Sequence, residues 1–319
     1  MSQSHPVPIV VIGAGHLGRF HIAKLMADPA ARLLGAVEVD TARAQVIRDE
    51  FGIRCEASLE AFLPDAHAAV IAAPTVHHHP LALHALAHGL DILIEKPIAS
   101  TEEQAREIIA LAAEKGCLVQ VGHTERFNPA VAAALAITDA PRYITTERLG
   151  PFSGRSTDID VVLDLLIHDL DIVSSLVASP LRSVSAVGVP ILTEETDMCS
   201  ARLEFDNGVV AEMKAGRASL EPSRKIRLIT QERYVSIDCG ERNVKSVRRV
   251  GAPTESGWPQ IQGEPVPVAE GDALALQASA FLSCVQTRST PAVCGEAGLR
   301  ALELANAVNA VMTTPYAKS

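Results

Sequence analysis

The stretch that decides the fold is Val10-Val11-Ile12-Gly13-Ala14-Gly15-His16-Leu17-Gly18. It places a G-x-G-x-x-G pattern between an apolar run, predicted as a strand over residues 9–12, and a predicted helix over residues 16–27. In that context Gly13 permits the tight turn, Gly15 lets a pyrophosphate approach the backbone, and Gly18 lets helix and strand pack closely. The N–H groups that begin the helix favour an anion. The pattern therefore predicts a dinucleotide-binding βαβ unit.

Short apolar runs and helical patterns continue to alternate up to residue 121. Strands are predicted at 33–39, 68–73, 92–94 and 118–121, and helices at 42–51, 81–88 and 101–115. Near-continuous apolar strands separated by helices indicate βαβ units and a parallel sheet that is covered on both faces. We therefore expect a doubly wound Rossmann domain over residues 1–122.

The pattern changes after residue 122. Helices are predicted at 127–136, 160–178, 270–287 and 295–312, and strands at 184–189, 198–205, 209–215, 224–230, 234–238 and 244–250. Asn207-Gly208, between two of these strands, is a hairpin signal. Residues 251–269, rich in glycine and proline, are predicted as a loop. The sequence thus predicts a second domain over residues 123–319, an α+β unit on a mainly antiparallel open sheet.

Composition excludes several classes of protein. The 319 residues include 28 basic and 38 acidic side chains, for a net charge of −10, and only 3% aromatic residues. Nucleic-acid binding needs concentrated positive charge or stacking aromatics, so we expect no such partner. The six cysteines form no C-x-x-C pair, which indicates reduced thiols in a cytoplasmic protein. No signal peptide and no apolar run of about 18 residues is present, so we expect no membrane span.

An acidic residue near the predicted second strand bears on the choice of dinucleotide. Glu38 lies about twenty residues after Gly18, the distance at which such folds place the acid that binds the adenine ribose. A carboxylate there repels the 2′-phosphate of NADP, so the sequence favours NAD. Arg43 lies nearby and weakens that preference. The alternative is that Glu38 and Asp40 are surface residues without a role.

Three further motifs follow predicted strands. They are Pro74-Thr75-Val76-His77-His78-His79, Glu95-Lys96-Pro97, and Gly122-His123-Thr124-Glu125-Arg126-Phe127-Asn128. Ligands of doubly wound sheets collect at the carboxyl ends of the strands, so a lysine at position 96 would point toward a bound nicotinamide. The alternative is that Lys96 only forms a surface salt bridge. The adjacent histidines suggest a metal, but neighbours in sequence seldom converge on one ion and no ligand pattern accompanies them. We therefore predict no metal.

Asp164 and His168 lie four residues apart on a predicted helix. That spacing puts both side chains on one face. A carboxylate beside an imidazole suits proton transfer near neutral pH. The alternative is structural, because such pairs also brace helices.

Together these motifs resemble the Gfo/Idh/MocA family of NAD(P)-dependent oxidoreductases, in order and spacing across the whole chain. The resemblance implies a Rossmann domain, then an α/β domain whose open sheet forms a homodimer or homotetramer, and oxidation or reduction of a sugar or cyclitol carbinol. It implies Lys96 and His168 as the catalytic pair, supported by Asp164. The implied cofactor contacts are Gly13, Gly15, His16, Leu17, Gly18, Glu38, Pro74, Thr75, His78, Glu95 and Lys96.

Residues 121–131, 150–156 and 161–171 are similar to those members that oxidise the 3-hydroxyl of UDP-N-acetylglucosamine or its uronic acid. Arginine suits the diphosphate or carboxylate of such a substrate. The implied substrate contacts are Arg126, Asn128, Arg155, Ser156, Asp164 and His168. His168 is the expected base and Lys96 the group that polarises the reacting oxygen, although the reverse assignment stays open.

Three alternatives to a nucleotide-sugar dehydrogenase remain open. The first is a family dehydrogenase of a free sugar, an inositol or another small polyol. The second is a non-catalytic NAD-sensing protein, although both the lysine and the histidine are present. The third is a nucleic-acid-binding repressor that senses redox state, against which the acidic charge and the missing helix-turn-helix pattern weigh.

Overall fold

The computed structural model describes residues 5–154 and 159–314 and divides the chain into two compact units. The first unit comprises the residues up to Thr124 together with Asp272–Leu302. The second comprises Glu125–Gly271 and the residues from Glu303 onward. The sequence prediction placed everything after residue 122 in a second domain, whereas the structure groups Asp272–Leu302 with the first unit.

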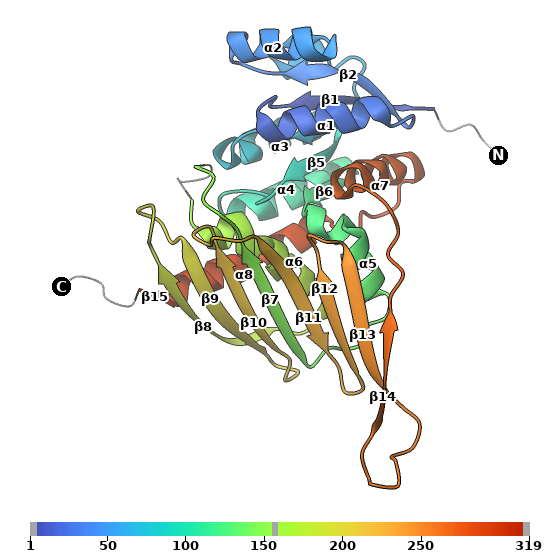
Figure 1. Cartoon of the computed structure of the whole chain (residues 1–319). Helices are drawn as coiled ribbons and strands as arrows, with labels where there is room; N and C mark the ends of the chain where they lie inside the picture. The colour runs from blue at the N-terminus through green and yellow to red at the C-terminus, as the bar shows by residue number, and fades with distance from the viewer. Residues whose placement is uncertain (1–4, 155–158, 315–319) are drawn as a thin grey trace. The chain divides into compact units, whose positions relative to one another are not determined.

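A parallel sheet forms the centre of the first unit (Figure 1). Its strands are β1 (Val7–Ile12), β2 (Ala31–Val37), β3 (Cys55–Glu56), β4 (Ala68–Ile71), β5 (Asp91–Glu95) and β6 (Val119–Gly122). The order across this six-stranded sheet is β3-β2-β1-β4-β5-β6, and each pairing is parallel. This is the doubly wound order of the Rossmann fold, so the predicted fold class of the first half is confirmed.

Helices and short 3₁₀ turns connect the strands of the first unit. They are α1 (His16–Ala27), α2 (Thr41–Phe51), η1 (Leu59–Ala61), η2 (Thr75–His77), α3 (His78–Ala87) and α4 (Glu102–Lys115). Helix α7 (Ala273–Thr287) also belongs to this unit, whereas the boundary between the units falls within η3 (Thr124–Phe127) and within α8 (Gly295–Val311). Local chemistry explains several boundaries. The Asp40 and Thr101 side chains accept hydrogen bonds from the first turns of α2 and α4, and Gly52 and Gly116 end those helices with positive φ.

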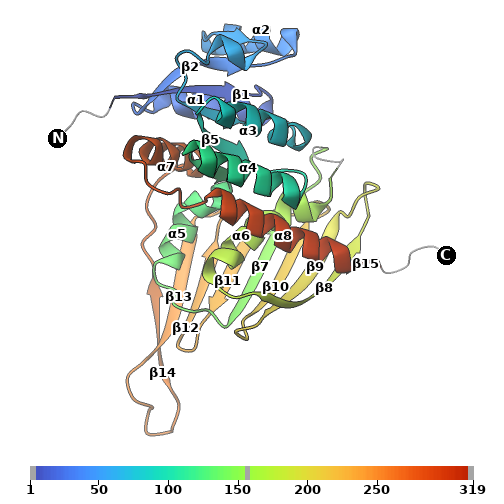
Figure 2. The ribbon, with the colours of Figure 1, turned by 180° about the vertical axis from the view of Figure 1, so that it is seen from behind.

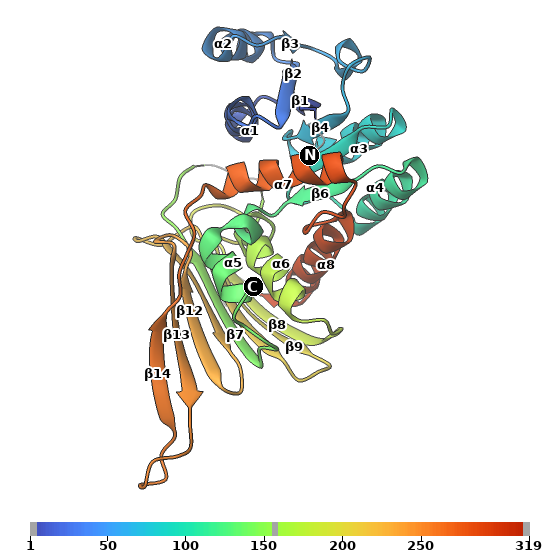
Figure 3. The same cartoon turned by 90° about the vertical axis from the view of Figure 1, so that its right-hand side faces the viewer.

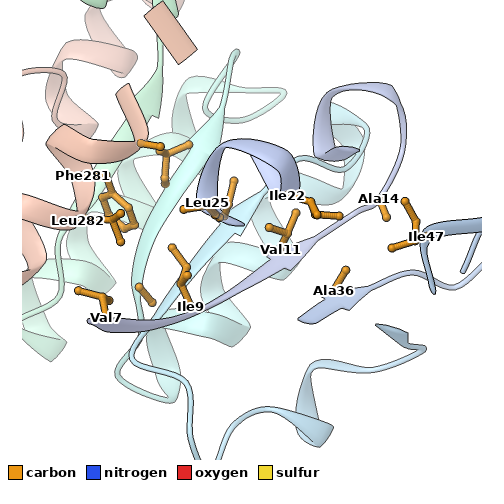
Figure 4. Close-up of a cluster of buried hydrophobic side chains, with 14 of the residues drawn as sticks. Val7, Ile9, Val11, Ala14, Ile22, Leu25, Ala36, Ile47, Phe281 and Leu282 are labelled. Carbon is orange, nitrogen blue, oxygen red and sulfur yellow. The ribbon is translucent and has the colours of Figure 1, made fainter. Parts of the chain in front are cut away.

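The core of the first unit explains why α7 belongs to it. Val7, Ile9 and Val11 of β1 pack with Ile22 and Leu25 of α1, and each is at most 4% exposed (Figure 4). The same buried cluster includes three residues of α7, namely Ala278, Phe281 and Leu282. Burying apolar side chains is the main favourable term in folding, and an amphipathic helix joins whichever core accepts its apolar face. The packing of α7 against β1 and α1 is a contact between segments far apart in the chain, so the pattern of apolar residues within α7 does not predict it.

The second unit is built on a larger sheet. Its strands are β7 (Tyr143–Leu149), β8 (Leu181–Val189), β9 (Met198–Phe205), β10 (Val210–Gly216), β11 (Ser223–Ile229), β12 (Arg233–Asp238), β13 (Asn243–Val250), β14 (Gln260–Pro265) and β15 (Met312–Thr313). The order across this nine-stranded sheet is β14-β13-β12-β11-β7-β10-β9-β8-β15. Only the β7–β10 and β8–β15 pairs are parallel, so the predicted mainly antiparallel sheet is confirmed.

Three strands of this sheet escaped the sequence prediction: β7, β14 and the two-residue β15, which begins at the last residue of the helix predicted over 295–312. Strand β7 lies near the middle of the sheet, but its sequence Tyr-Ile-Thr-Thr-Glu-Arg-Leu shows no alternation of apolar and polar residues, because two of its three buried residues, Thr146 and Arg148, are polar. Strand β14 falls within residues 251–269, which were predicted as a loop, and pairs antiparallel with β13. That prediction was wrong for 260–265, because an edge strand with a largely exposed surface has no apolar period to recognise.

Helices cover one face of the second sheet. The segment predicted as a helix over 160–178 forms a π-helical turn, η4 (Val162–Leu166), and then α6 (Ile167–Leu176). Together with α5 (Pro129–Leu135), α6 lies behind the strands in Figure 1 and in front of them in Figure 2; Figure 3 shows both helices on the same side. Ala211, Met213 and Ala215 of β10 are buried, whereas Glu212 and Lys214 between them are exposed. The sheet thus has one packed face and one open face.

No helix within residues 5–154 and 159–314 is long and apolar enough to cross a bilayer.

Candidate active site

A pocket of about 970 Å³ opens at the glycine-rich turn of the first unit. Its lining includes five of the predicted cofactor residues: Gly13, Gly15, His16, Glu38 and Pro74. It also includes residues that the sequence reasoning did not assign to the cofactor, among them Ser58, Leu59, His77, His84 and the flanking Arg43. These residues lie after β1, β2, β3 and β4, at the edge where doubly wound sheets bind ligands. Size, position and the open glycine turn fit a dinucleotide.

The three glycines of the turn meet different constraints. Gly13 has φ +89°, which side-chain-bearing residues rarely adopt. A Cβ on Gly18 would overlap the carbonyl oxygen of Gly13, so this position requires the close approach of helix and turn. A Cβ on Gly15 would meet nothing within 4 Å, so nothing in the protein itself requires glycine there. That open position fits the predicted role of Gly15, which is to leave room for a pyrophosphate.

Glu38 is buried beside the turn rather than displayed on the surface. Its carboxylate accepts hydrogen bonds from the backbone N–H of Ala14 at 3.1 Å and of Asp40 at 3.0 Å. Arg43 Nη1 lies 3.2 Å from the same carboxylate, with half of the arginine side chain exposed. The alternative that Glu38 is a surface residue is therefore wrong. The acid is fixed at the pocket wall, and the half-exposed Arg43 side chain lies next to it.

The remaining predicted cofactor residues of this unit occupy helix α1 and the turns after β4 and β5. Leu17 is 37% exposed on the first turn of α1, and Thr75 begins η2. Glu95 ends β5, Lys96 follows it half-buried, and the Lys96–Pro97 peptide bond is cis. His78 is only 1% exposed, and its ring nitrogens lie 2.8 Å from the carbonyl oxygens of Ala73 and Pro97. Burial lowers the pKa of His78, which favours the neutral ring.

The second unit carries the predicted carboxylate–imidazole pair. Asp164 lies on the π-helical turn η4 and His168 on the first turn of α6, and both are half-buried. Asp160 Oδ1 accepts hydrogen bonds from the backbone N–H of Val162 and of Leu163. The start of the helical segment is therefore fixed just before Asp164. Arg155 and Ser156, two of the predicted substrate contacts, lie outside the described residues.

Arg126 and Asn128 have protein partners that the sequence did not predict. Arg126 Nη1 lies 3.5 Å from Asp171, a carboxylate with no exposed surface. Asn128 caps α5 by accepting the Ala130 N–H at 3.0 Å, and its amide nitrogen lies 3.1 Å from the Cys239 carbonyl oxygen. Both side chains thus help to build the framework. Their contacts with a substrate stay a prediction.

A buried ion cluster anchors α6 next to His168. Arg148 of β7 forms a two-pronged pair with Asp169, at 2.7 and 3.2 Å, and also contacts Glu125 at 3.1 Å. Burial alone would lower the pKa of Arg148, but the two carboxylates more than offset it and the pKa is raised. Asp169 directly follows His168, so this pair fixes the backbone that carries the imidazole. Sequence reasoning missed Arg148 because it missed strand β7.

A second buried arginine braces the chain ahead of the helix. Arg217 Nε lies 2.7 Å from Asp197, and its Nη1 donates to the carbonyl oxygen of Ile159 at 2.8 Å. Asp197 also accepts the backbone N–H groups of Ile191 and Leu192. Burial would raise the pKa of Asp197, but Arg217 and these N–H groups lower it well below its usual range. The segment before Asp164 is thus tied to a fixed ion pair.

Within the part of the chain that the structure covers, no group of three or more His, Cys, Asp or Glu side chains is arranged to hold a metal ion.

Two family models match the chain. Residues 7–123 match "Oxidoreductase family, NAD-binding Rossmann fold", and residues 155–313 match "Oxidoreductase family, C-terminal alpha/beta domain". The chain belongs to the Gfo/Idh/MocA family. It is an NAD(P)-dependent oxidoreductase of that family, and its first unit is the NAD-binding Rossmann domain.

Individual members of the family cover most of the chain. The UDP-N-acetylglucosamine 3-dehydrogenase of Acidithiobacillus ferrooxidans is 39% identical over 92% of this chain and 94% of that protein. A solved structure of that enzyme superposes with a TM-score of 0.89, at 37% identity, over 96% of this chain and 97% of that one. The scyllo-inositol 2-dehydrogenase (NAD(+)) of Bacillus subtilis is 29% identical over 68% of this chain and 69% of its own length.

Replacing two of the glycines separates cofactor binding from folding. Gly15→Ala is expected to leave the thermal unfolding midpoint of the cofactor-free protein unchanged, because its Cβ meets no atom, yet to weaken NAD binding by about tenfold or more. Gly18→Ala is expected to destabilise the cofactor-free protein by about 1–3 kcal/mol, because its Cβ overlaps Gly13. Calorimetric titration with NAD and thermal unfolding measure the two effects. Unchanged NAD affinity in Gly15→Ala would contradict the assigned pyrophosphate site.

Proposed function

We propose that the protein is an NAD-dependent dehydrogenase that oxidises the 3-hydroxyl of UDP-N-acetylglucosamine or of a closely related UDP-amino sugar. The observation that carries this proposal is the 39% identity to the Acidithiobacillus enzyme over 92% of the chain, a span that includes both units. The residues expected to perform the reaction, Lys96, Asp164 and His168, are all present. The 29% identity to an inositol dehydrogenase supports the wider class of carbinol substrates.

The proposed division of labour follows from residue chemistry. His168 accepts the proton of the substrate hydroxyl, and Asp164 supports the imidazole. Lys96 donates a hydrogen bond to the same oxygen and stabilises the negative charge that develops on it. NAD, when bound, supplies the acceptor for the hydride released from the sugar carbon. The C–H and O–H bonds break, a ketone forms, and the proton leaves through His168.

A lysine replacement and a mass measurement test the reaction and the substrate. The protein is mixed with NAD and either UDP-N-acetylglucosamine or its uronic acid at single-turnover concentrations, so that one equivalent of product is sufficient for detection. We expect NADH and a sugar product about two mass units lighter. Lys96→Met is expected to lower the rate by about 100-fold or more while NAD still binds, because the reacting oxygen loses its cationic partner.

The matched control is Lys115→Met, which changes an exposed lysine at the end of α4 and is expected to leave the rate unchanged. A Lys96→Met rate close to that of the unmodified protein would exclude the assigned role of Lys96. If neither UDP-sugar is oxidised although NAD binds, the substrate is instead a free sugar, an inositol or another small polyol.

We further propose that Glu38 makes NAD the preferred cofactor. Glu38→Gln keeps an oxygen for the Ala14 or Asp40 N–H but removes the charge that repels a 2′-phosphate, and it releases Arg43 to pair with that phosphate. The ratio of NAD to NADP affinity is expected to fall by about tenfold or more. Fluorescence titration with both reduced cofactors measures it. Glu56→Gln, at the end of β3, is the control; an equal fall in both variants would contradict the proposal.

We propose that the open face of the second sheet joins copies of the chain into a homodimer or homotetramer. Glu212 and Lys214 point to this face, and its hollow of about 690 Å³ is also lined by small residues such as Thr145, Ser185 and Ser200. Small side chains allow two sheets to approach closely.

An arginine placed on the open face tests this assembly. In Ser200→Arg the new cation lies opposite Lys214 in the β9–β10 register. Sedimentation velocity is expected to show dissociation toward the single chain, because a bulky side chain would replace a small one in the interface and would bury a second cation next to Lys214. Ser256→Arg, in the exposed connection between β13 and β14, is the control. A single-chain species in the unmodified protein, or equal behaviour of both variants, would contradict the proposed interface.

A further inference from the structure

Two buried histidines hold the residues on either side of Lys96. His21 of α1 has no exposed surface, and its Nε2 lies 2.7 Å from Glu95 Oε1. His78 of α3 is 1% exposed, and its Nδ1 lies 2.8 Å from the Pro97 carbonyl oxygen. Glu95 and Pro97 are the sequence neighbours of Lys96. The first unit thus supplies one imidazole to each end of this turn.

Glu95 is enclosed as tightly as its histidine partner. The residue is 4% exposed, and one of its carboxylate oxygens accepts the Lys96 backbone N–H at 3.4 Å. Space for the carboxylate exists only because residue 122 is glycine: a Cβ there would lie 2.5 Å from Glu95 Oε2. A buried carboxylate is costly unless it is paired and hydrogen-bonded. The His21–Glu95 contact therefore cannot be lost without moving the start of the turn.

His78 also connects the turn to its neighbour in the sheet. Its Nε2 lies 2.8 Å from the carbonyl oxygen of Ala73, which follows β4. One ring thus links the ends of β4 and β5. A neutral imidazole has one N–H, so it donates to only one of the two carbonyl groups at a time. Lys96 is thus held either through a hydrogen bond from His78 to the Pro97 carbonyl group or through one to the Ala73 carbonyl group, and an experiment can distinguish the two.

We propose that His21 and His78 are positioning residues that fix Lys96, acting through Glu95 and through the Pro97 carbonyl group. This inference rests on the proposed role of Lys96 as the group that binds the reacting oxygen. Both histidines are almost completely buried, and the contacts described above join each of them to a sequence neighbour of Lys96. Misplacing a catalytic group by about 1 Å costs about 100-fold in rate, so a small shift of this turn is sufficient to be measured.

Asparagine and glutamine variants distinguish positioning from ordinary core packing. Asparagine places an N–H near the former Nδ1, and glutamine places one near the former Nε2. His78→Asn therefore keeps the Pro97 contact, whereas His78→Gln keeps only the Ala73 contact. At His21 the order reverses, because the Glu95 contact uses Nε2: His21→Gln keeps it and His21→Asn loses it. The proposal thus requires that asparagine replace His78 better than glutamine does, and that glutamine replace His21 better than asparagine does.

The decisive measurement needs no sugar substrate. The full-length protein is acetylated with a limiting reagent across a range of pH, and the rate at Lys96 is read by mass spectrometry relative to exposed Lys115. We expect the pH dependence of Lys96 acetylation to change in His78→Gln and in His21→Asn, which lose the contact beside Lys96. We expect it to stay unchanged in His78→Asn and in His21→Gln, which keep that contact. In turnover, the first two variants are expected to lose about 10–100-fold in kcat with KM within about threefold.

Each outcome decides the proposal. If all four variants melt like the unmodified protein and share its Lys96 profile, the histidines are core residues and the proposal is overturned. The proposal is also overturned if the change in Lys96 acetylation follows the loss of thermal stability of each variant and does not depend on which imidazole nitrogen the new side chain replaces. If one position does not tolerate replacement, the pair at the other histidine still tests the prediction. Absence of UDP-sugar oxidation in the unmodified protein would reject the proposed substrate but leave the acetylation result interpretable.

Discussion

The close fit of helix α1 against the glycine turn is the constraint on which the chemistry of the first unit depends. Gly18 allows the helix to lie against the Gly13 carbonyl group, and Ile22 and Leu25 then pack on the β1 side of the core. His21 lies on the same helical stripe, three residues after Gly18, and so faces inward to Glu95. Helix α1 therefore packs against the glycine turn at Gly18, within its first helical turn, and contacts Glu95 beside Lys96 through His21, three residues later.

Buried charge is concentrated next to the residues that are expected to react. In the first unit, His21 pairs with Glu95 beside Lys96; in the second, Arg148 pairs with Asp169 beside His168. Such pairs are expensive to bury and contribute little net stability compared with apolar residues of equal size. The hydrogen bonds in these pairs are, however, directional, so they restrict the position of the backbone more tightly than apolar packing does. Their position supports the view that they serve orientation more than stability.

Most of the first unit could be predicted because its signals are local. The glycine spacing, the apolar strands and the capping pattern at Thr101 each depend on residues close in sequence. Strand β7 could not be found, because two of its inward residues, Thr146 and Arg148, are polar and an arginine is ordinarily expected at the surface. The placement of α7 depended on Phe281 meeting a core made almost 270 residues earlier. Such tertiary pairings leave no trace in a single sequence.

In the candidate site too, motifs formed by neighbouring residues could be recognised in the sequence, whereas contacts between residues far apart in the chain could not. The spacing paired Asp164 with His168, and the family resemblance pointed to Lys96 and His168 as the catalytic pair. Neither revealed that Arg126 contacts Asp171 or that Asn128 caps α5. His21 shares the buried stripe of Gly18 and Leu25, but histidine is only intermediate among residue types in how often it is buried, so the sequence did not single it out. A buried imidazole is costly without a hydrogen-bond partner, and the partner of His21 is Glu95, which precedes Lys96. The functional importance of a polar residue in this fold thus follows from what it is buried against, not from its type.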